Sequence, residues 1–381
     1  MPFTPNLVIA LIATVIAFST LYIPQPMLPL LASEFGVSAS ETGLLMTLAM
    51  LPLAVAPIAY GFFLQAIPAR LMLQVALALL AVNQLCFLFA TEFWHLLALR
   101  LVQGLLLPAI FTALMTYCAS MAAPGQVRRV MGFYIGATII GGFSGRLVGG
   151  LFAGAFDWHT AFLVMGLLQL LPLTLLTRVE ADADINFARL DRRAALRVLA
   201  DREYRAMFLF LATVFFVFSG ILNIVPFHLA DIHPGSSPLL IAMLYLGYLV
   251  GAPISMFSDR ISQLLGNERR GLMLGLVIHA IGLTAMLFVA LSGLILSMFL
   301  LAAGFFLVHA LLSGLANHRA REHKGVVNGL YVSIYYLSGA LGSWLPGYLY
   351  EGLGWQVMIV LFLVLLTAGA VGIRRFDRSP H

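Results

Sequence analysis

The chain has 381 residues, of which 61% are hydrophobic and only 10% are charged, and its formal net charge is +5. A soluble protein of this length carries about a quarter charged residues, so the composition excludes a soluble globular protein. The net positive charge alone would also fit a nucleic-acid-binding protein, but the distribution of the basic residues indicates a different origin.

Apolar residues come in twelve blocks of about 20 residues each, the length that a helix needs to cross the hydrocarbon core of a bilayer. Backbone groups in lipid must be hydrogen-bonded within the segment, which predicts helices and not single strands. The sequence therefore predicts an all-α membrane protein with twelve transmembrane helices. The blocks cover roughly residues 7–31, 40–62, 70–90, 95–119, 129–153, 159–177, 206–230, 237–257, 271–291, 294–315, 326–349 and 354–373.

Lysine and arginine residues gather on one side of the predicted membrane. Of the 21 basic residues, Arg100 and Arg146 lie inside apolar blocks, and the other 19 lie in loops on the side of the two termini. The loops on the opposite side contain no lysine or arginine. Because cytoplasmic loops of membrane proteins carry an excess of basic residues, both termini are predicted to be cytoplasmic. The basic character thus reflects topology, and no nucleic-acid partner is expected.

The segment between residues 178 and 205 carries charges of both signs and separates two sets of six blocks. It is predicted to be a cytoplasmic linker (179–205) that contains a short interfacial helix over residues 194–204. The rest of the chain is expected to form an N-terminal six-helix bundle (1–178) and a C-terminal six-helix bundle (206–381).

An internal repeat supports two similar halves. A shift of 197 residues aligns the fifth block with the eleventh without a gap. Parallel repeats of this kind build transporters whose substrate site lies at the repeat interface, so we expect two pseudo-symmetric bundles. The aligned identities are Gly132/Gly329, Tyr134/Tyr331, Gly142/Gly339, Gly145/Gly342, Gly150/Gly347 and Trp158/Trp355.

The fourth block contains Arg100, Gln103 and Gly104, which share one helix face because they lie three and four residues apart. A buried arginine in a membrane must face the bundle interior or water, which makes Arg100 and Gln103 candidate pathway residues. The alternative is an arginine that extends toward the nearby membrane surface and pairs with Glu92.

The fifth block carries glycines at 132, 141, 145 and 149, with Arg146 directly after the third. The four-residue steps from Gly141 to Gly149 predict a glycine face that lets another helix approach closely. Arg146 adds a second positive charge near the middle of the bilayer.

Several other side chains are candidates for lining a pathway. Gln25 lies between two prolines at the end of the first block, where prolines kink a helix and free backbone carbonyls. Asn223, His309, Tyr335 and Tyr336 lie within later blocks. A lone histidine is more often a hydrogen-bonded core residue, and aromatic residues at helical spacing usually pack, so both alternatives stay open.

Glu41 follows Ser38 by three residues at the start of the second block. This spacing predicts a capping box at the helix N-terminus, and we assign Glu41 a structural role.

The loops add a further pattern, with Gly61 and Arg70 around the turn after the second block and Ser258-Asp259-Arg260 after the eighth. Together with the R-x-x-Q-G signature at Arg100 and the glycine spacing of the fifth block, these residues resemble the major facilitator superfamily. The resemblance extends over essentially the whole chain. Within the superfamily the sequence is most similar to the drug:proton antiporter branch, and there to the bacterial acriflavine-susceptibility group of inner-membrane exporters.

The resemblance implies a major-facilitator fold and a cytoplasmic gate formed by Gly61, Arg70, Asp259 and Arg260. Gln65 stands at the acidic position of the N-terminal gate motif, so that copy is degraded and the gate would rest on Asp259 and Arg260. The alternative is that these two residues are ordinary loop charges.

The same resemblance implies a role for Arg100 in proton coupling and associates the glycines at 132, 141, 145 and 149 with export. Arg146 departs from the family pattern, which has proline after the third glycine.

No aspartate or glutamate falls near the middle of any block, whereas Arg100 and Arg146 make the interior positive. This charge balance favours a neutral, zwitterionic or anionic amphiphile with Arg146 as its counter-ion. The resemblance to dye exporters implies cations instead, and we give the charge count more weight.

The sequence contains no G-x4-G-K-[ST] nucleotide-binding loop, no H-E-x-x-H zinc motif and no G-x-S-x-G nucleophile motif. We therefore expect a secondary active transporter and not an enzyme, without a cofactor or metal. The expected function is proton-coupled efflux of a small amphiphilic molecule by a monomer in the bacterial inner membrane. The alternatives are proton-coupled uptake of a metabolite and a non-transporting membrane sensor.

Overall fold

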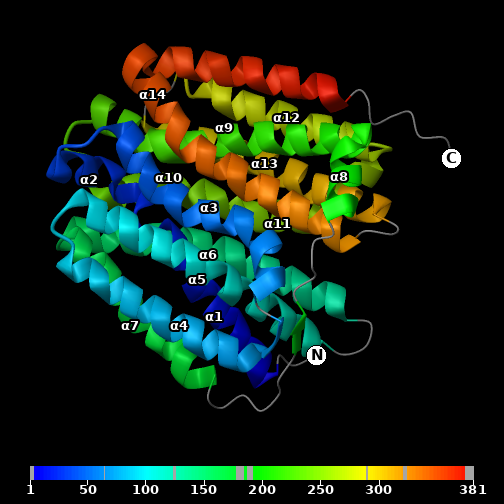
Figure 1. Cartoon of the computed structure of the whole chain (residues 1–381). Helices are drawn as coiled ribbons and strands as arrows, with labels where there is room; N and C mark the ends of the chain where they lie inside the picture. The colour runs from blue at the N-terminus through cyan, green and yellow to red at the C-terminus, as the bar shows by residue number, and fades with distance from the viewer. Residues whose placement is uncertain are drawn as a thin grey trace.

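The computed structural model of the chain describes residues 4–63, 65–122, 126–176, 184–186, 192–288, 291–320 and 324–373. Long helices running roughly side by side account for nearly all of it (Figure 1). The helices are α1 (Pro5–Tyr22), α2 (Leu28–Phe35), α3 (Ala39–Phe63), α4 (Ala69–Cys86), α5 (Phe93–Ser120), α6 (Val127–Ala155), α7 (Trp158–Leu175), α8 (Arg192–Ala200), α9 (Arg202–Ile232), α10 (Pro238–Leu244), α11 (Gly251–Leu264), α12 (Glu268–Ala285), α13 (Leu291–Arg319) and α14 (Lys324–Ile373), with 3-10 turns η1 (Gln25–Met27), η2 (Phe87–Phe89) and η4 (Tyr245–Val250).

Ten helical segments of the described chain are long and apolar enough to cross a membrane. One of them, α14, is two helices that meet at Gly354, where φ is +80°, and Figure 1 shows its orange and red parts folding back on each other. Helix α12 has 18 residues, as many as α4 and α7, but it begins with the three charged residues Glu268, Arg269 and Arg270 and is not among the ten. With α12 counted and α14 divided, the twelve predicted membrane helices are confirmed.

The all-α fold class is confirmed, and the structure adds a short two-stranded sheet in the connections that was not expected from the sequence. Strand β1 (Gln65–Pro68) pairs antiparallel with β2 (Asp184–Asn186), with Gln65 opposite Asn186 and Pro68 opposite Asp184. Both strands lie outside the apolar blocks, where the chain is not required to bond its backbone within a helix. The degraded gate position Gln65 thus lies in a strand that joins the α3–α4 connection to the segment before α8.

The linker was predicted to contain a helix over residues 194–204, and the structure instead has α8 at Arg192–Ala200 with α9 beginning at Arg202. Asp201 separates the two helices because its side chain caps the N-terminus of α9, accepting from the backbone N–H groups of Glu203 and Tyr204. The predicted boundary between residues 178 and 179 lies outside the described residues.

The first membrane crossing is broken in the middle, as the proline cluster predicts. Helix α1 ends at Tyr22, the chain makes the turn η1, and α2 resumes at Leu28. Pro24 has no backbone N–H, so the carbonyl of Thr20, four residues earlier, loses its helical donor. The break leaves carbonyl oxygens of α1 free in the interior and turns Gln25 inward, where it is 1% exposed.

Buried apolar side chains of the described residues form three clusters. Two of them draw nearly all their members from the chain before residue 177, and the third draws nearly all of its members from after residue 197. The two parts of the chain meet where α3 packs on α14 and where α6 packs on α10 and η4. This interface contains the candidate site.

Two N-caps fix helix starts at the membrane surface. The predicted capping box is confirmed, because the Ser38 N–H donates to Glu41 Oε2 at 2.8 Å and the Glu41 N–H donates to Ser38 Oγ at 3.2 Å. Asp157 caps α7 by accepting the Thr160 N–H at 2.8 Å, and this bond lowers the pKa of the Asp157 carboxyl below its usual range.

Candidate functional site

Helix α6 approaches α1 closely through the glycines of the fifth predicted span. A Cβ at three of these positions would overlap the backbone of α1 or of its C-cap residue: at Gly141 it would meet Val15, at Gly145 Ser19, and at Gly149 the C-cap Ile23. The hydroxyl of Ser19 bonds across this contact to the carbonyl oxygen of Gly141 at 3.0 Å. Gly132 differs from the other three, since a Cβ there would meet nothing within 4 Å. The glycine face predicted from the four-residue steps is therefore the α1 contact, and Gly132 lies outside it.

Arg100 on α5 is fully buried, and every N–H of its guanidinium has an acceptor. It does not extend to the membrane surface toward Glu92, which instead caps α5 together with His95. Arg100 therefore ties α5 to the broken end of α1 and to α3. The acceptors are the carbonyl oxygens of Leu45 (2.7 Å), Thr20 (3.2 Å) and Leu21 (2.7 Å), the side-chain oxygen of Gln103 (2.6 Å) and the sulfur of Met46 (3.6 Å).

Arg146 on α6 is also fully buried, but its guanidinium is only partly satisfied. Its Nε donates to the side-chain oxygen of Gln25 at 2.6 Å, and its Nη1 donates to the carbonyl oxygen of Gly142 at 2.8 Å. Its Nη2 has no hydrogen-bond partner of acceptable geometry, and the hydroxyl of Tyr248 is the nearby polar group of the chain that interacts with the guanidinium. No carboxylate of the described residues pairs with Arg146. The two buried arginines predicted from the sequence thus differ in kind, because Arg100 is fully bonded and Arg146 keeps an unused donor.

Three tyrosine rings surround the Arg146 guanidinium, and we call them the tyrosine cage. Its carbon lies 4.2 Å from the ring centre of Tyr22, 4.5 Å from that of Tyr248 and 4.8 Å from that of Tyr245. A cation over aromatic faces is stabilised by the negative potential of the rings. Tyr22 belongs to α1, whereas Tyr245 and Tyr248 belong to η4, so the cage joins the two parts of the chain.

A chain of hydrogen bonds continues from Arg146 across the interface, and we call it the polar chain (Arg146, Gln25, Asn223 and Ser343). Gln25 Nε2 donates to Asn223 Oδ1 at 3.0 Å, and Asn223 Nδ2 donates to Ser343 Oγ at 2.9 Å. All four side chains are at most 1% exposed. Apart from Nη2 of Arg146, these side chains are hydrogen-bonded, and a bonded polar network in a buried interface fixes how its two sides fit together.

His309, Tyr335 and Tyr336 lie in the second part of the chain and do not contact Arg146. The ring of Tyr335 stacks on Phe215 with centroids 3.8 Å apart, and His309 Nδ1 shares a hydrogen bond with the hydroxyl of Tyr331 at 3.0 Å. Tyr336 stands perpendicular to Tyr335 and packs against a cluster of the first part of the chain. These residues extend the aromatic lining of the interface, with His309 as a hydrogen-bonded neighbour.

The predicted gate residues lie away from this site, near the ends of helices. Asp259 and Arg260 are exposed and lie in the last turns of α11, not in a loop as the sequence predicts. The helix continues past its apolar part because no helix-breaking residue occurs before Gly266, where φ is +91°. Gly61 lies in the last turn of α3, and Arg70 is the second residue of α4.

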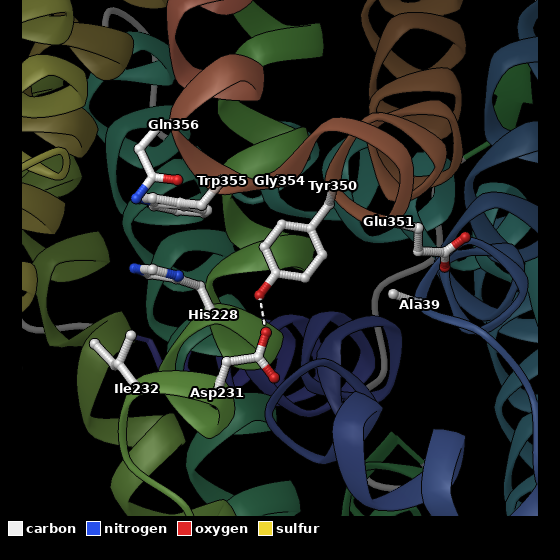
Figure 2. A pocket seen from close by; sticks show the side chains of 9 residues that line it. All are labelled: Ala39, His228, Asp231, Ile232, Tyr350, Glu351, Gly354, Trp355 and Gln356. Carbon is white, nitrogen blue, oxygen red and sulfur yellow. Dashed lines mark hydrogen bonds between the residues drawn. The ribbon is translucent and has the colours of Figure 1, made fainter.

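A pocket of about 470 Å³ opens where α9, α14 and the start of α3 meet. Figure 2 shows the hydroxyl of Tyr350 pointing to the carboxylate of Asp231, to which it donates a hydrogen bond, and the ring of His228 lying flat against Trp355. The His228 and Trp355 ring centres are 4.0 Å apart. The second carboxylate of the pocket, Glu351, points away from Asp231 toward α3 (Figure 2).

Glu351 joins α14 to the N-terminus of α3. Its carboxylate accepts the backbone N–H of Ser40 at 2.8 Å and the hydroxyl of the same residue at 3.0 Å. The two helices touch here, because a Cβ at Gly347 would overlap Ser40 and a Cβ at Gly43 would overlap the carbonyl of Ser343. The chain is therefore packed tightly across the interface at this end.

Sequence reasoning missed the tyrosine cage, Ser343 and Glu351. A signal for Ser343 was present, because a shift of 197 residues from Arg146 arrives at Ser343. The tyrosines and Glu351 gave no such signal, since their partners lie far away in the sequence.

Residues 10–343 match the sequence profile of the Major Facilitator Superfamily. Among curated proteins, the chain is 28% identical over 377 residues to the inner membrane transport protein YnfM of Escherichia coli strain K12, covering 95% of this chain and 88% of YnfM.

Two solved structures share the fold. The nucleoside transporter NupG superposes with a TM-score of 0.79 at 11% identity, covering 97% of this chain and 100% of NupG. A bacterial homologue of the human lysosomal transporter Spinster, in an inward-facing and unoccupied conformation, superposes with a TM-score of 0.78 at 15% identity, covering 99% of this chain and 98% of that structure. The chain is a multi-pass membrane transporter of major-facilitator fold and not an enzyme, and it belongs to the Major Facilitator Superfamily.

Proposed function

We propose that the protein is a secondary active transporter of the bacterial inner membrane that exports a small amphiphilic molecule in exchange for protons. The polar chain carries this proposal, because it places polar side chains of both parts of the chain in one buried interface. Transporters built from parallel repeats bind their substrates at such an interface and expose it alternately to each side.

The contacts support two pseudo-symmetric halves, residues 1–178 and 206–381, joined by the linker 179–205. Gly145 packs on the backbone of Ser19, and Gly342 packs on the backbone of Phe216, with both members shifted by 197 residues. The polar chain follows the same relation. Arg146 bonds to Gln25 as Ser343 bonds to Asn223, with shifts of 197 and 198 residues.

The two halves also pack closely at one end, through two contacts that are related by nearly the same shift in sequence. Gly150 would overlap Pro238 at the start of α10 if it carried a Cβ, and Gly347 would overlap Ser40 at the start of α3. These contacts lie on the side whose loops lack lysine and arginine. With both termini in the cytoplasm, this side is the outer one. The conformation is then closed to the outside, and export requires this end to separate.

Arg100 acts as a structural anchor in this proposal. Its five N–H groups are occupied by acceptors on α1, α3 and α5, so none remains for a substrate or for a proton relay. Asp259 and Arg260 keep the gate role implied by the resemblance, at the inner end of α11.

Export and proton coupling rest on the glycine face of α6 and on the resemblance to the drug:proton antiporter branch. No carboxylate lies near the middle of a predicted span, so a coupling proton must use a group near the ends or a histidine such as His309. Glu41 is engaged in its capping box, and Glu34 is exposed in the last turn of α2. Glu351 spans the interface and is therefore the strongest carboxylate candidate.

A substrate screen in proteoliposomes with an imposed pH gradient tests the proposal. We expect at least one small amphiphile to move in exchange for protons, with the flux abolished by Arg146→Met and retained by Arg129→Met, a matched change at an exposed arginine of α6. Movement together with protons would make the protein an importer. Absence of any gradient-driven flux across a broad panel would contradict the transport proposal.

A further inference from the structure

Several buried polar side-chain atoms of the described residues lack a hydrogen-bond partner, and among them Nη2 of Arg146 is the one that belongs to a permanently charged group. A buried charge is costly unless it is paired, and a buried donor without an acceptor calls for a specific explanation. Arg100 provides the internal comparison. It is equally buried in the same half, and the fold supplies acceptors for all of its N–H groups. The difference indicates that the missing acceptor at Arg146 comes from outside the chain.

The surroundings of Arg146 limit the charge of that acceptor. The nearby groups of the chain are neutral: the amide of Gln25, the carbonyl of Gly142 and the tyrosine cage. The uncompensated charge is therefore a single positive one, which one negative charge balances. A cation at this position would be repelled by Arg146 with no carboxylate to offset it.

The geometry of the guanidinium limits the shape of the acceptor. Nε and Nη1 are held by Gln25 and Gly142, so the free donors lie on the edge of the guanidinium plane at Nη2. A planar carboxylate fits such an edge better than a tetrahedral dianion, because it accepts N–H groups in the plane and carries one charge. The rings of Tyr22, Tyr245 and Tyr248 lie within 4.8 Å of the guanidinium carbon and favour an apolar or aromatic body beside it.

We propose that Arg146 Nη2 and the tyrosine cage bind the carboxylate of a small aromatic or amphiphilic monoanion. This inference rests on the proposed transport function and names the substrate class of its site. The cage is assembled from α1 and η4, so the bound anion joins the two halves through the same contacts that hold Arg146. Separation of the halves removes Tyr245 and Tyr248 from the guanidinium and releases the anion.

Binding of three matched probes to the purified full-length protein tests the proposal: benzoate, benzamide and benzylamine, which share a ring and differ in charge. Binding is measured with radiolabelled probe by scintillation proximity. We expect benzoate to bind and the neutral and cationic probes to bind at least about 10-fold more weakly, because only benzoate balances the charge of Arg146 and forms a hydrogen bond in which both partners are ionised.

Two variants locate the site. Arg146→Met should weaken benzoate binding by about 10- to 100-fold, and Arg129→Met, on an exposed turn of the same helix, should leave it unchanged. Arg146→Lys keeps the charge without the planar fork and should fall between Arg146→Met and the native protein. If Arg146→Met does not fold, the affinity of Arg146→Lys and the order of the three probes on the native protein still test whether Arg146 forms the site.

The proposal is overturned if benzamide or benzylamine binds as well as benzoate, if no probe binds, or if Arg146→Met leaves benzoate binding intact. It is also overturned if chloride or nitrate displaces benzoate at equal concentration, since the site would then be one for inorganic anions. The transport screen in proteoliposomes tests the transport function independently of these binding measurements. Proton-driven flux of other compounds without benzoate binding refutes the substrate class alone, whereas benzoate binding without any flux refutes the transport function alone.

Discussion

Replacing Arg100 with methionine should destabilise the protein severely, because it removes the donors that satisfy the broken end of α1. The carbonyl oxygens of Thr20 and Leu21 accept from Arg100 and lie in the last turn of α1, where a helix provides no donors of its own. An unsatisfied buried acceptor costs about 1–3 kcal/mol, so the two carbonyls together should lose about 2–6 kcal/mol.

Arg146→Met is the matched control for this prediction. Gly142 lies one turn before Arg146 in α6, so its carbonyl also receives the backbone N–H of Arg146 as a helical donor. Only the amide of Gln25 loses a partner, and a partly unpaired buried charge disappears at the same time. The Arg146→Met variant should therefore lose clearly less stability than the Arg100→Met variant.

The comparison is made by thermal unfolding of the two variants and the native protein in the same detergent, read as the loss of monodisperse protein after heating. Arg100→Met should unfold at a lower temperature than Arg146→Met by several degrees. An Arg100→Met protein as stable as the native one but without proton-driven flux would refute the anchor role and support proton coupling through Arg100.

Three further substitutions probe separate parts of the structure. Gly145→Leu should prevent folding because its side chain would overlap the backbone of α1, whereas Gly132→Leu should be tolerated, as measured by the yield of monodisperse protein; equal yields would contradict the assigned contact. Glu351→Gln should weaken the contact between α3 and α14 and speed alkylation of an Ala39→Cys reporter by up to about 10-fold, since it replaces charge-assisted hydrogen bonds to Ser40 with neutral ones. An unchanged rate would show that this carboxylate does not hold the two helices together. Asp157→Ala should cost about 0.5–2 kcal/mol at neutral pH as the loss of an N-cap. Because the folded-state pKa of Asp157 is lowered, its contribution is present above the ordinary aspartate pKa and disappears as the pH falls through the lowered value, so native protein and variant should converge in acid.

The helices and several local features could be predicted because their causes lie close together in the sequence. The twelve spans follow from the length of the apolar blocks, and the Ser38–Glu41 capping box follows from a three-residue spacing. The close approach of α6 to α1 follows from glycines four residues apart.

The site was only half predictable, because its other half depends on contacts between distant residues. Arg100 and Arg146 were both identified as buried charges, but which of them is satisfied depends on the carbonyls freed by the break in α1. The tyrosine cage forms only because η4 lies against α1 and α6, and no local sequence pattern predicts this arrangement. The β1–β2 pairing was missed for the same reason, since its strands are more than 100 residues apart.

A reversible cross-link between α3 and α14, where Ser40 meets Glu351, tests the central claim, alternating access to the interface, most directly. Ser40→Cys and Glu351→Cys place thiols on α3 and α14 where their native side chains are hydrogen-bonded, in a background without Cys86 and Cys118. The variant is reconstituted into proteoliposomes, and its two introduced thiols are cross-linked with a short bis-methanethiosulfonate. Proton-driven flux is then measured for a compound that the variant transports without the cross-link. The account predicts that cross-linking stops the flux and that a reducing agent restores it. Full flux with the cross-link in place would contradict it.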